Sequence, residues 1–103
     1  MDYKTISDTV NNIAETAREM RTLKNEIRRA ENMLSAVKKH NRGTITLLRF
    51  GDKQKVALSY TAHNKQKCAD ILKTYADELK DQLCNHCIVL TKLSELVTVA
   101  MDL

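Results

Sequence analysis

The sequence contains no proline or tryptophan, two glycines, three tyrosines and one phenylalanine. Because proline and glycine are the residues that most often interrupt helices and form tight turns, their scarcity excludes a loop-rich enzyme fold. No apolar run approaches the roughly 18 residues of a membrane span, and the first residues lack the apolar segment of a secretion signal. We therefore expect a soluble protein of the cytoplasm, or of the host cytoplasm if the chain is viral, with no membrane partner.

The abundant residues include Ala, Leu, Glu, Lys and Arg, which favour long helices. The chain of 103 residues is predicted to form a single domain, residues 1–103. A domain of this size buries only about 60 to 65% of the surface of its unfolded chain, so its core is small. We therefore expect a partner, most simply a second copy, to add buried surface.

Residues 5–41 are predicted to form one long amphipathic helix, because apolar residues recur at helical spacing. Thr5 and Asp8 have the spacing of a capping box at its start, and Gly43 is suited to a left-handed stop after its end. The apolar stripe of this helix consists of Ile6, Val10, Ile13, Ala17, Met20, Leu23, Ile27, Ala30, Leu34 and Val37.

Residues 44–60 are predicted to form a β-hairpin. Side chains alternate between two faces in "TITLLRF" and in "KVALSY", and "GDKQ" between them is typical of a turn. An isolated two-stranded hairpin is marginally stable in water, so this one is expected to pack on helices or to pair with a hairpin of another copy. Because a hairpin brings its two ends together, the flanking helices should lie antiparallel, with the hairpin at their tip.

Residues 62–101 are predicted to form a second long helix. Its end, "CIVLTKLSELVTVAM", is apolar on more than one face, so one partner helix cannot cover it. The alternative is that "LVTVAM" forms a terminal strand, because Val and Thr favour strands. The predicted fold class is mostly α: a long helix, a β-hairpin and a long helix, whose antiparallel helical pair assembles, like a coiled coil, into an oligomeric helical bundle. The residues that we expect at the oligomer interface are Leu79, Leu83, His86, Leu90, Leu93 and Val97.

The segment "DQLCNHCIVL" places two cysteines and a histidine within four positions. On a helix Cys84 and Cys87 share one side, whereas His86 lies about 200° from Cys84, so the three cannot ligate one metal ion. Redox enzymes with C-x-x-C spacing place the reactive cysteine at a helix N-terminus, not in mid-helix. We expect no metal and no cofactor. The cysteines are interpreted as small buried apolar residues of an interface, and His86 as a hydrogen-bonded residue that fixes helix register.

The net charge of +4 is unevenly distributed. Residues 38–67 hold eight basic residues and one acidic residue, a net charge of +7, whereas the rest of the chain holds nine basic and twelve acidic residues, a net charge of −3. Cations near the start of a helix, whose free amides also attract negative charge, favour a phosphate or another anion. The candidate anion-binding residues of this segment are Lys38, Lys39, Arg42, Arg49, Lys53, Lys55, His63, Lys65 and Lys67.

Each basic set also has a simpler interpretation. Cations at the end of the first helix can offset its dipole without any ligand. A second candidate set, Arg18, Arg21 and Arg28, could line a groove between copies, because the planar guanidinium suits phosphates. Glutamates three residues away can instead pair with such arginines on the surface; the pairs are Glu15 with Arg18, Glu26 with Arg29, and Arg28 with Glu31.

No Ser/His/Asp set, paired carboxylates or glycine-rich phosphate motif can be assembled, so we expect a binding protein and not an enzyme. Nucleic acid is a possible partner for such a basic chain, but there are few aromatic residues to stack on bases and no signature of a nucleic-acid-binding fold.

The order of a long helix, the hairpin "GTITLLRFGDKQKVALSY" and a long helix resembles the β-type subunit of prefoldin, a chaperone whose hairpins join a central platform from which paired helices project. The resemblance covers most of the chain and implies a chaperone or a coiled-coil adaptor. As one small basic chain with self-associating helices, the sequence is also similar in style to accessory proteins of bacterial viruses. Some of these inhibit host defence by blocking a host protein or by sequestering nucleotide signals between subunits.

The function that we expect is that of a non-enzymatic, homo-oligomeric binding protein. It is predicted to act as a phage inhibitor of host defence that binds a nucleotide or other anionic small molecule, or that blocks an acidic host protein. The alternatives are a prefoldin-like chaperone or adaptor, and a non-specific nucleic-acid-binding protein.

Overall fold

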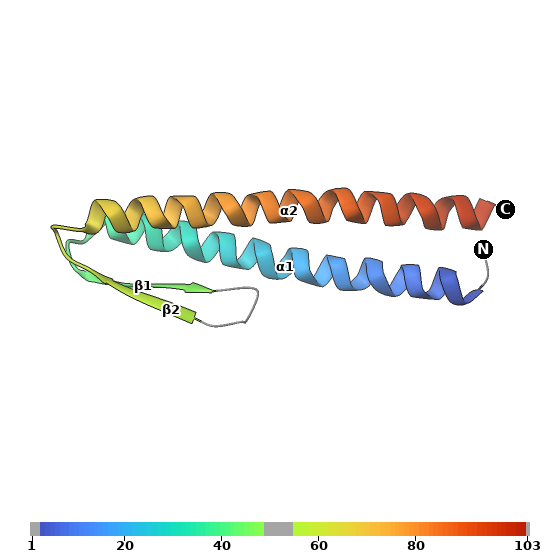
Figure 1. Ribbon diagram of the computed structural model, residues 1–103, viewed down its shortest axis with the longest axis horizontal. Helices are drawn as coiled ribbons and strands as arrows, with labels where there is room; N and C mark the ends of the chain where they lie inside the picture. Colours follow the sequence, from blue (N-terminus) through green and yellow to red (C-terminus); the bar gives the residue numbers. More distant parts are fainter. Residues whose placement is uncertain (1–2, 49–54, 103) are drawn as a thin grey trace. The chain divides into compact units, whose positions relative to one another are not determined.

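The computed structural model describes residues 3–48 and 55–102. Its elements are helix α1 (Tyr3–Lys39), strands β1 (Gly43–Leu48) and β2 (Lys55–Tyr60), and helix α2 (Lys65–Asp102) (Figure 1). This confirms the predicted order of long helix, β-hairpin and long helix. The alternative of a terminal strand is wrong, because residues 96–101 are helical. None of the described helices has a stretch long and apolar enough to cross a membrane.

The start of α1 differs from the prediction. The helix already includes Tyr3, so Thr5 lies within it and is not its cap. The carbonyl oxygen of Thr5 instead accepts a hydrogen bond from the hydroxyl of Thr9 at 2.8 Å. The predicted capping box of Thr5 and Asp8 is therefore wrong.

The end of α1 also differs. The helix ends at Lys39, and the N–H of His40 donates to the carbonyl of Ala36 at 3.0 Å. Gly43 is not a left-handed stop; it is the first residue of β1 and lies opposite Tyr60. A side chain at Gly43 would meet the ring of Tyr60, so close approach and not backbone conformation explains the glycine.

β1 and β2 form a two-stranded antiparallel sheet, with a register that runs from Gly43 opposite Tyr60 to Leu48 opposite Lys55. As predicted, the strands are two-sided. One face carries apolar side chains that are buried or half-buried, and the other carries small exposed ones. The inner face consists of Ile45, Leu47, Val56, Leu58 and Tyr60, and the outer face includes Thr44, Ala57 and Ser59.

The hairpin folds back along the helices instead of extending beyond them (Figure 1). Its Ile45 and Tyr60 form one buried cluster with Val37 of α1 and with α2 residues, of which Leu72 is fully buried. The prediction that the hairpin forms the tip is therefore wrong. Sequence periodicity does not show which way a hairpin turns after the helix, whereas burial of the apolar hairpin face requires that it pack on the helices.

The chain comprises two compact units, and both helices continue from one into the other. We call residues 26–79 the hairpin unit, and residues 1–25 with 80–103 the helix-pair unit. The prediction of a single domain stays a prediction. The hairpin unit holds most of the buried side chains, which are Glu26, Ala30, Val37, Ile45, Tyr60, Cys68, Ala69, Leu72, Ala76 and Leu79.

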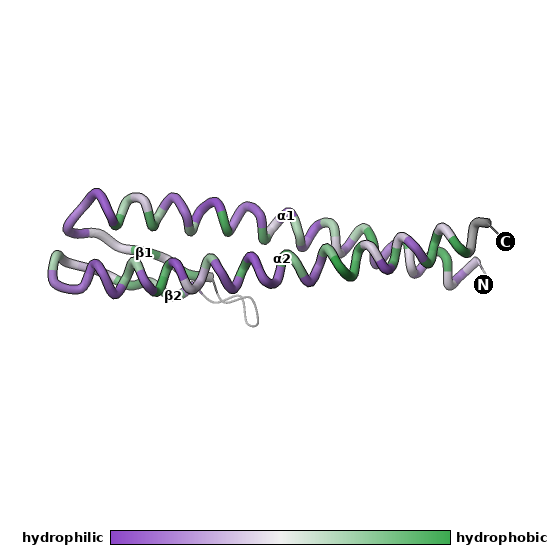
Figure 2. The backbone as a smooth tube through the Cα atoms, turned by 90° about the horizontal axis from the view of Figure 1, so that it is seen from above, coloured by the Kyte–Doolittle hydropathy of each residue, from purple (hydrophilic) through white to green (hydrophobic). Residues whose placement is uncertain are grey.

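In the helix-pair unit, segments of α1 and α2 lie side by side, with Glu19 hydrogen-bonded to His86. Polar and apolar residues alternate along both segments (Figure 2). Only Thr9 and Leu23 are buried among the described residues of this unit. We call the residues of each helix that face the other helix the seam. Its remaining residues are half-buried: Ile6, Ile13, Thr16, Met20, Leu83, His86, Leu90, Leu93 and Val97.

The α1 seam corrects two positions of the predicted stripe. Val10 is 47% exposed and Ala17 is also exposed, whereas Thr9 and Thr16 take their places. The seam alternates steps of three and four residues, as two helices packed along their length require. Thr9 is tolerated there because its hydroxyl is hydrogen-bonded within the helix.

Candidate anion-binding site

The end of α1 and the start of α2 are joined by the side chain of Lys65. Its ammonium donates to Oδ1 of Asn41 at 3.1 Å and to the carbonyl oxygen of Lys38 at 3.4 Å. Lys38 lies in the last turn of α1, where carbonyl groups lack helical partners. Lys65 therefore has a structural role, because it donates a hydrogen bond to a free carbonyl group at the end of α1 and connects the two helix ends.

A turn at Asn64 sets the direction of α2. The N–H of Thr61 donates to Oδ1 of Asn64 at 2.6 Å, and the N–H of Asn64 donates to the carbonyl of Thr61 at 3.2 Å. The carbonyl of Asn64 accepts the N–H of Cys68 at 3.1 Å, which begins the helical pattern. The first turn of α2 contains lysines and no acidic residue. Since cations at a helix N-terminus oppose the helix dipole, this turn favours a negative charge nearby.

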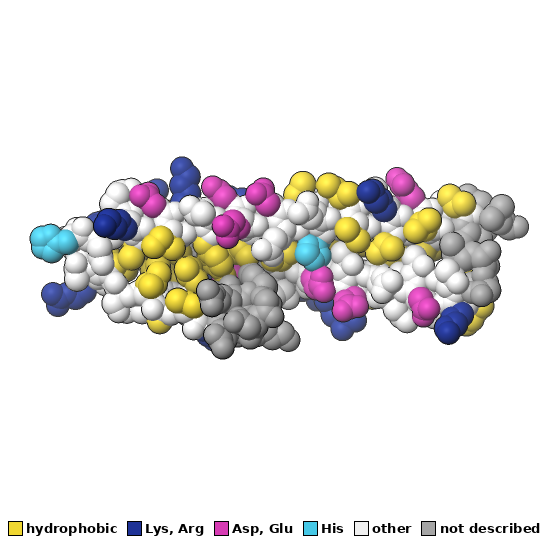
Figure 3. Space-filling model, in the orientation of Figure 1, with side chains coloured by type: hydrophobic (Ala, Val, Ile, Leu, Met, Phe, Trp, Pro, Cys, Tyr) yellow, Lys and Arg dark blue, Asp and Glu magenta, His cyan; other side chains and the backbone are white. Residues whose placement is uncertain are grey.

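Apart from the half-buried Lys65, the cations around this junction are exposed. The described residues from Asn32 to Ala69 include no Asp or Glu. Within the described part of the chain, none of Lys38, Lys39, Arg42 and Lys67 forms an ion pair. Figure 3 shows cationic and histidine side chains at this end of the hairpin unit. We call the set the basic end; it consists of Lys38, Lys39, His40, Arg42, His63, Lys65 and Lys67.

The structure brings together only part of the predicted anion-binding set. Lys55 pairs with Leu48 at the other end of the hairpin, away from the basic end. Arg49 and Lys53 lie outside the described residues. His40 was missing from the prediction, although its position directly after Lys39 is a signal for it.

The arginines predicted along α1 are exposed and do not join the basic end. Arg18 and Arg21 belong to the helix-pair unit, and Arg28 belongs to the hairpin unit. Of the three predicted surface pairs, that between Glu26 and Arg29 is confirmed as an ion pair.

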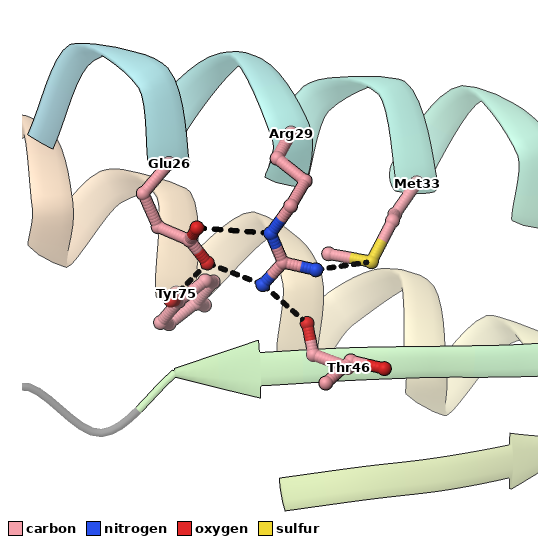
Figure 4. A network of polar contacts seen from close by, with 5 residues as sticks. All are labelled: Glu26, Arg29, Met33, Thr46 and Tyr75. Atoms are coloured by element: carbon pink, nitrogen blue, oxygen red, sulfur yellow. Dashed lines mark hydrogen bonds and ion pairs between the residues drawn. The ribbon is translucent and has the colours of Figure 1, made fainter. Parts of the chain in front are cut away.

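A polar network in the hairpin unit links α1, α2 and β1 (Figure 4). Arg29 donates from Nε to Oε2 of Glu26 at 2.9 Å, and its Nη2 contacts Oε1 of Glu26. The same Nη2 donates to the carbonyl of Thr46 in β1 at 2.7 Å, and the Tyr75 hydroxyl of α2 donates to Oε1 of Glu26 at 2.6 Å. Nη1 lies 3.5 Å from the sulfur of Met33. The network attaches the hairpin to the helices.

The network also determines the ionisation of Glu26. Burial raises the pKa of Glu26, but the hydrogen bonds from Arg29 and Tyr75, together with the charges of Arg29 and Lys55, outweigh burial and lower the pKa below its ordinary value. The hydrogen bond to Glu26 raises the pKa of Arg29. This arrangement is an ion pair between a buried carboxylate and a partly exposed guanidinium, and its polar atoms are hydrogen-bonded to one another.

The six residues predicted at an oligomer interface lie on the side of α2 that carries its intrachain seam. Leu79 is 1% exposed, so it belongs to the core of a single chain. The other five are half-buried, and their contact with a second copy stays a prediction. The expected hydrogen bonding of His86 is confirmed: Nδ1 lies 2.7 Å from the carbonyl of Gln82 and Nε2 lies 2.8 Å from Oε2 of Glu19.

The cysteines are unbridged thiols. Cys68 is buried, whereas Cys84 and Cys87 are exposed in the single chain, so burial of those two at an interface stays a prediction. Among the residues that the structure describes, no group of three His, Cys, Asp or Glu side chains could hold a metal ion.

Comparison of the chain with protein-family models, with curated proteins and with solved structures gave no match.

Proposed function

We propose that this protein is a non-enzymatic binding protein that holds a phosphorylated small molecule, of the nucleotide class, at its basic end. One observation carries the proposal: two helix ends, joined by Lys65, present clustered cations, and the described residues from Asn32 to Ala69 include no acidic residue. A phosphate would neutralise several of these charges at once and would match the positive end of the α2 dipole.

A role as an inhibitor of host defence is the biological context that we propose for such binding. Its support is the similarity in style to accessory proteins of bacterial viruses, some of which sequester nucleotide signals, together with the absence of any assembled catalytic motif in the sequence. The clustered cations of the basic end favour an anionic small molecule, whereas a chaperone would capture unfolded clients on exposed apolar surface, such as that of Ile88, Leu96 and Val99 in α2.

The structure guides the choice of test variants. Replacing Lys65 would disturb the contacts with Lys38 and Asn41 and would confuse binding with folding. Arg42 and Lys67 are exposed and form no ion pair within the described residues, so their replacement tests the charge alone. Lys24 and Lys73 are exposed lysines outside the basic end and provide a matched control.

The experiment is calorimetric titration of ATP, as the probe, into wild type, the Arg42→Glu/Lys67→Glu variant and the Lys24→Glu/Lys73→Glu variant. Loss of two charge-assisted contacts should weaken binding by about tenfold or more in the first variant, while the control, with the same net charge, keeps wild-type affinity. No binding of ATP to the wild type, or equal losses in both variants, would overturn the proposal. Tight, strongly salt-dependent binding of an oligonucleotide without binding of ATP would favour the nucleic-acid alternative.

A further inference from the structure

The outward side of α2 in the helix-pair unit carries exposed apolar side chains. Ile88 and Leu96 are each 49% exposed, and Val99 is 61% exposed. At 100° per residue Ile88 and Val99 lie opposite the seam of His86, Leu90, Leu93 and Val97, whereas Leu96 lies about 90° from it. Two shallow grooves border this side, one reaching Val99 and the other Ile88, and they share Thr91 and Glu95. Figure 3 shows exposed apolar side chains along α2 in this unit.

The unit also buries little within one chain. Among its described residues only Thr9 and Leu23 are buried, whereas the hairpin unit buries ten side chains. A pair of helices covers one stripe of each helix, and a helix that is apolar on a second side gains stability when that side is covered as well. The outward side of α2 is therefore a surface at which a further helix would increase the buried area.

The charges on this side indicate which helix that is. Ile88, Lys92, Glu95 and Val99 follow one another in steps of four, three and four residues, which places them on one face. The order of these residues is apolar, basic, acidic, apolar. When a second copy runs in the opposite direction, each apolar residue meets an apolar one and each basic residue meets an acidic one. In two antiparallel copies related by a twofold axis between residues 93 and 94, Ile88 lies opposite Val99 of the second copy, and Lys92 lies opposite Glu95 of the second copy.

The two charged residues are available for this pairing. Lys92 and Glu95 are exposed, and neither forms an ion pair with the other or with any other described residue. A parallel arrangement would place Lys92 beside Lys92 and Glu95 beside Glu95 of the second copy. Like charges at such positions disfavour that orientation, so the charges select the antiparallel one.

We propose that the face formed by Ile88, Lys92, Glu95 and Val99, with Leu96 at its edge, binds the same face of a second copy, with the α2 helices antiparallel and with two ion pairs between Lys92 and Glu95 at the centre. This is a different surface from the stripe predicted from the sequence, which lies on the seam side of α2. The inference is independent of the proposed function, because it involves no residue of the basic end.

A charge-exchange experiment tests the pairing. Native mass spectrometry and light scattering over a range of concentrations would compare wild type, Lys92→Glu, Glu95→Lys, the double variant Lys92→Glu/Glu95→Lys, and an equimolar mixture of the two single variants. Each single variant creates two repulsive pairs and should weaken self-association by about tenfold or more. The double variant should restore association, and the mixture should form heterodimers, because one chain then carries two acidic and the other two basic residues.

A wild type that stays monomeric at all concentrations would overturn the proposal, as would single variants that associate like wild type or a mixture without heterodimers. Lys73→Glu, an exposed charge change outside this face, should associate like wild type. Circular dichroism verifies that each variant is folded. Binding of ATP is measured separately, so that failure of the pairing and failure of the proposed function are distinguishable.

Discussion

Gly43 and Tyr60 face each other across the hairpin, and the tyrosine fills the space that a side chain at Gly43 would need. A Cβ atom at Gly43 would lie 2.8 Å from the Tyr60 hydroxyl and 3.0 Å from Cζ. Tyr60 is buried in the core cluster, so its ring has little room to move. We expect Gly43→Ala to lower the free energy of unfolding by about 1 to 3 kcal/mol, as overpacking of a core does, measured by chemical denaturation.

The double variant Gly43→Ala/Tyr60→Phe provides the control. It removes the hydroxyl, which is the nearest of the contacting atoms, and should recover part of the loss relative to Tyr60→Phe alone. If Gly43→Ala is as stable as wild type, the close approach of Tyr60 does not explain the glycine.

His86 is the second residue whose surroundings have a measurable consequence. Its two ring nitrogens contact a carbonyl oxygen and a carboxylate, and only the imidazolium can donate to both. The hydrogen bond to the carbonyl of Gln82 and, after it, the interaction with Glu19 raise the pKa of His86 above its ordinary value of 6.5. The resulting stability is therefore fully present below pH 6.5 and is lost as the pH rises through the raised pKa.

We expect the wild type to lose stability over that pH range relative to His86→Gln, which lacks the titrating group. Urea unfolding at a series of pH values measures the difference, and Glu19→Gln should reduce it by removing the negative partner. Parallel pH profiles of wild type and His86→Gln would show that the contacts of His86 do not stabilise the fold.

At the scale of elements, the hairpin is attached to α1 by Arg29, which donates both to Glu26 and to the carbonyl of Thr46. Removal of Arg29 leaves the Glu26 carboxylate buried without its cation and leaves the Thr46 carbonyl without this donor. We expect Arg29→Met to lower the free energy of unfolding by about 2 kcal/mol and Tyr75→Phe by about 1 kcal/mol, and we expect amide exchange in β1 to accelerate in Arg29→Met.

The pH dependence of this network has the opposite sign to that of His86. The pKa of Glu26 is lowered in the folded state, so its stabilisation is present above pH 4.5, the ordinary value, and is lost as the pH falls through the lowered pKa. Glu26→Gln should remove this part of the acid sensitivity in urea unfolding. If the stability of Glu26→Gln falls at low pH as steeply as that of wild type, Glu26 is not the group responsible for this loss.

The elements themselves were largely predictable, because helical and strand periodicities are local properties of the sequence. The α1 seam carried a readable signal as well: stepping back by sevens from Leu23 leads to Thr16 and Thr9, and not to Val10. Val10 is more apolar than Thr9, so hydropathy alone favours Val10, whereas the seven-residue repeat favours Thr9. Exposure of Cys84 and Cys87 follows from the same register, since both lie off the α2 seam.

Other features could not be predicted, because they depend on contacts between residues distant in sequence. Arg29 and Thr46 are 17 positions apart, and Glu26 and Tyr75 are 49 apart. Nothing in local pattern shows that the hairpin folds back, or that Lys65 contacts Asn41 while Lys67 remains exposed. The basic character of the segment was visible in the sequence, but its division into structural and free lysines was not.

At the scale of the whole molecule, the two units differ in how much they bury. The hairpin unit has a closed core, whereas the helix-pair unit has a seam of half-buried residues. We expect amides of residues 3–25 and 80–99 to exchange through openings of lower free energy than those of residues 30–37 and 68–79, measured by native-state hydrogen exchange on the Lys92→Glu variant. Equal protection of both units would contradict the difference in burial.

The seams of α1 and α2 repeat every seven residues, and neither helix contains a glycine or proline. Antiparallel helices with this repeat keep their facing residues when one whole repeat is removed from each, provided that the two repeats lie opposite one another. The helix-pair unit is therefore modular in length: it can become longer or shorter in steps of one heptad while the hairpin core and the basic end keep their geometry. Descendants of this sequence could thus differ in the length of the helix-pair unit while the basic end stays the same.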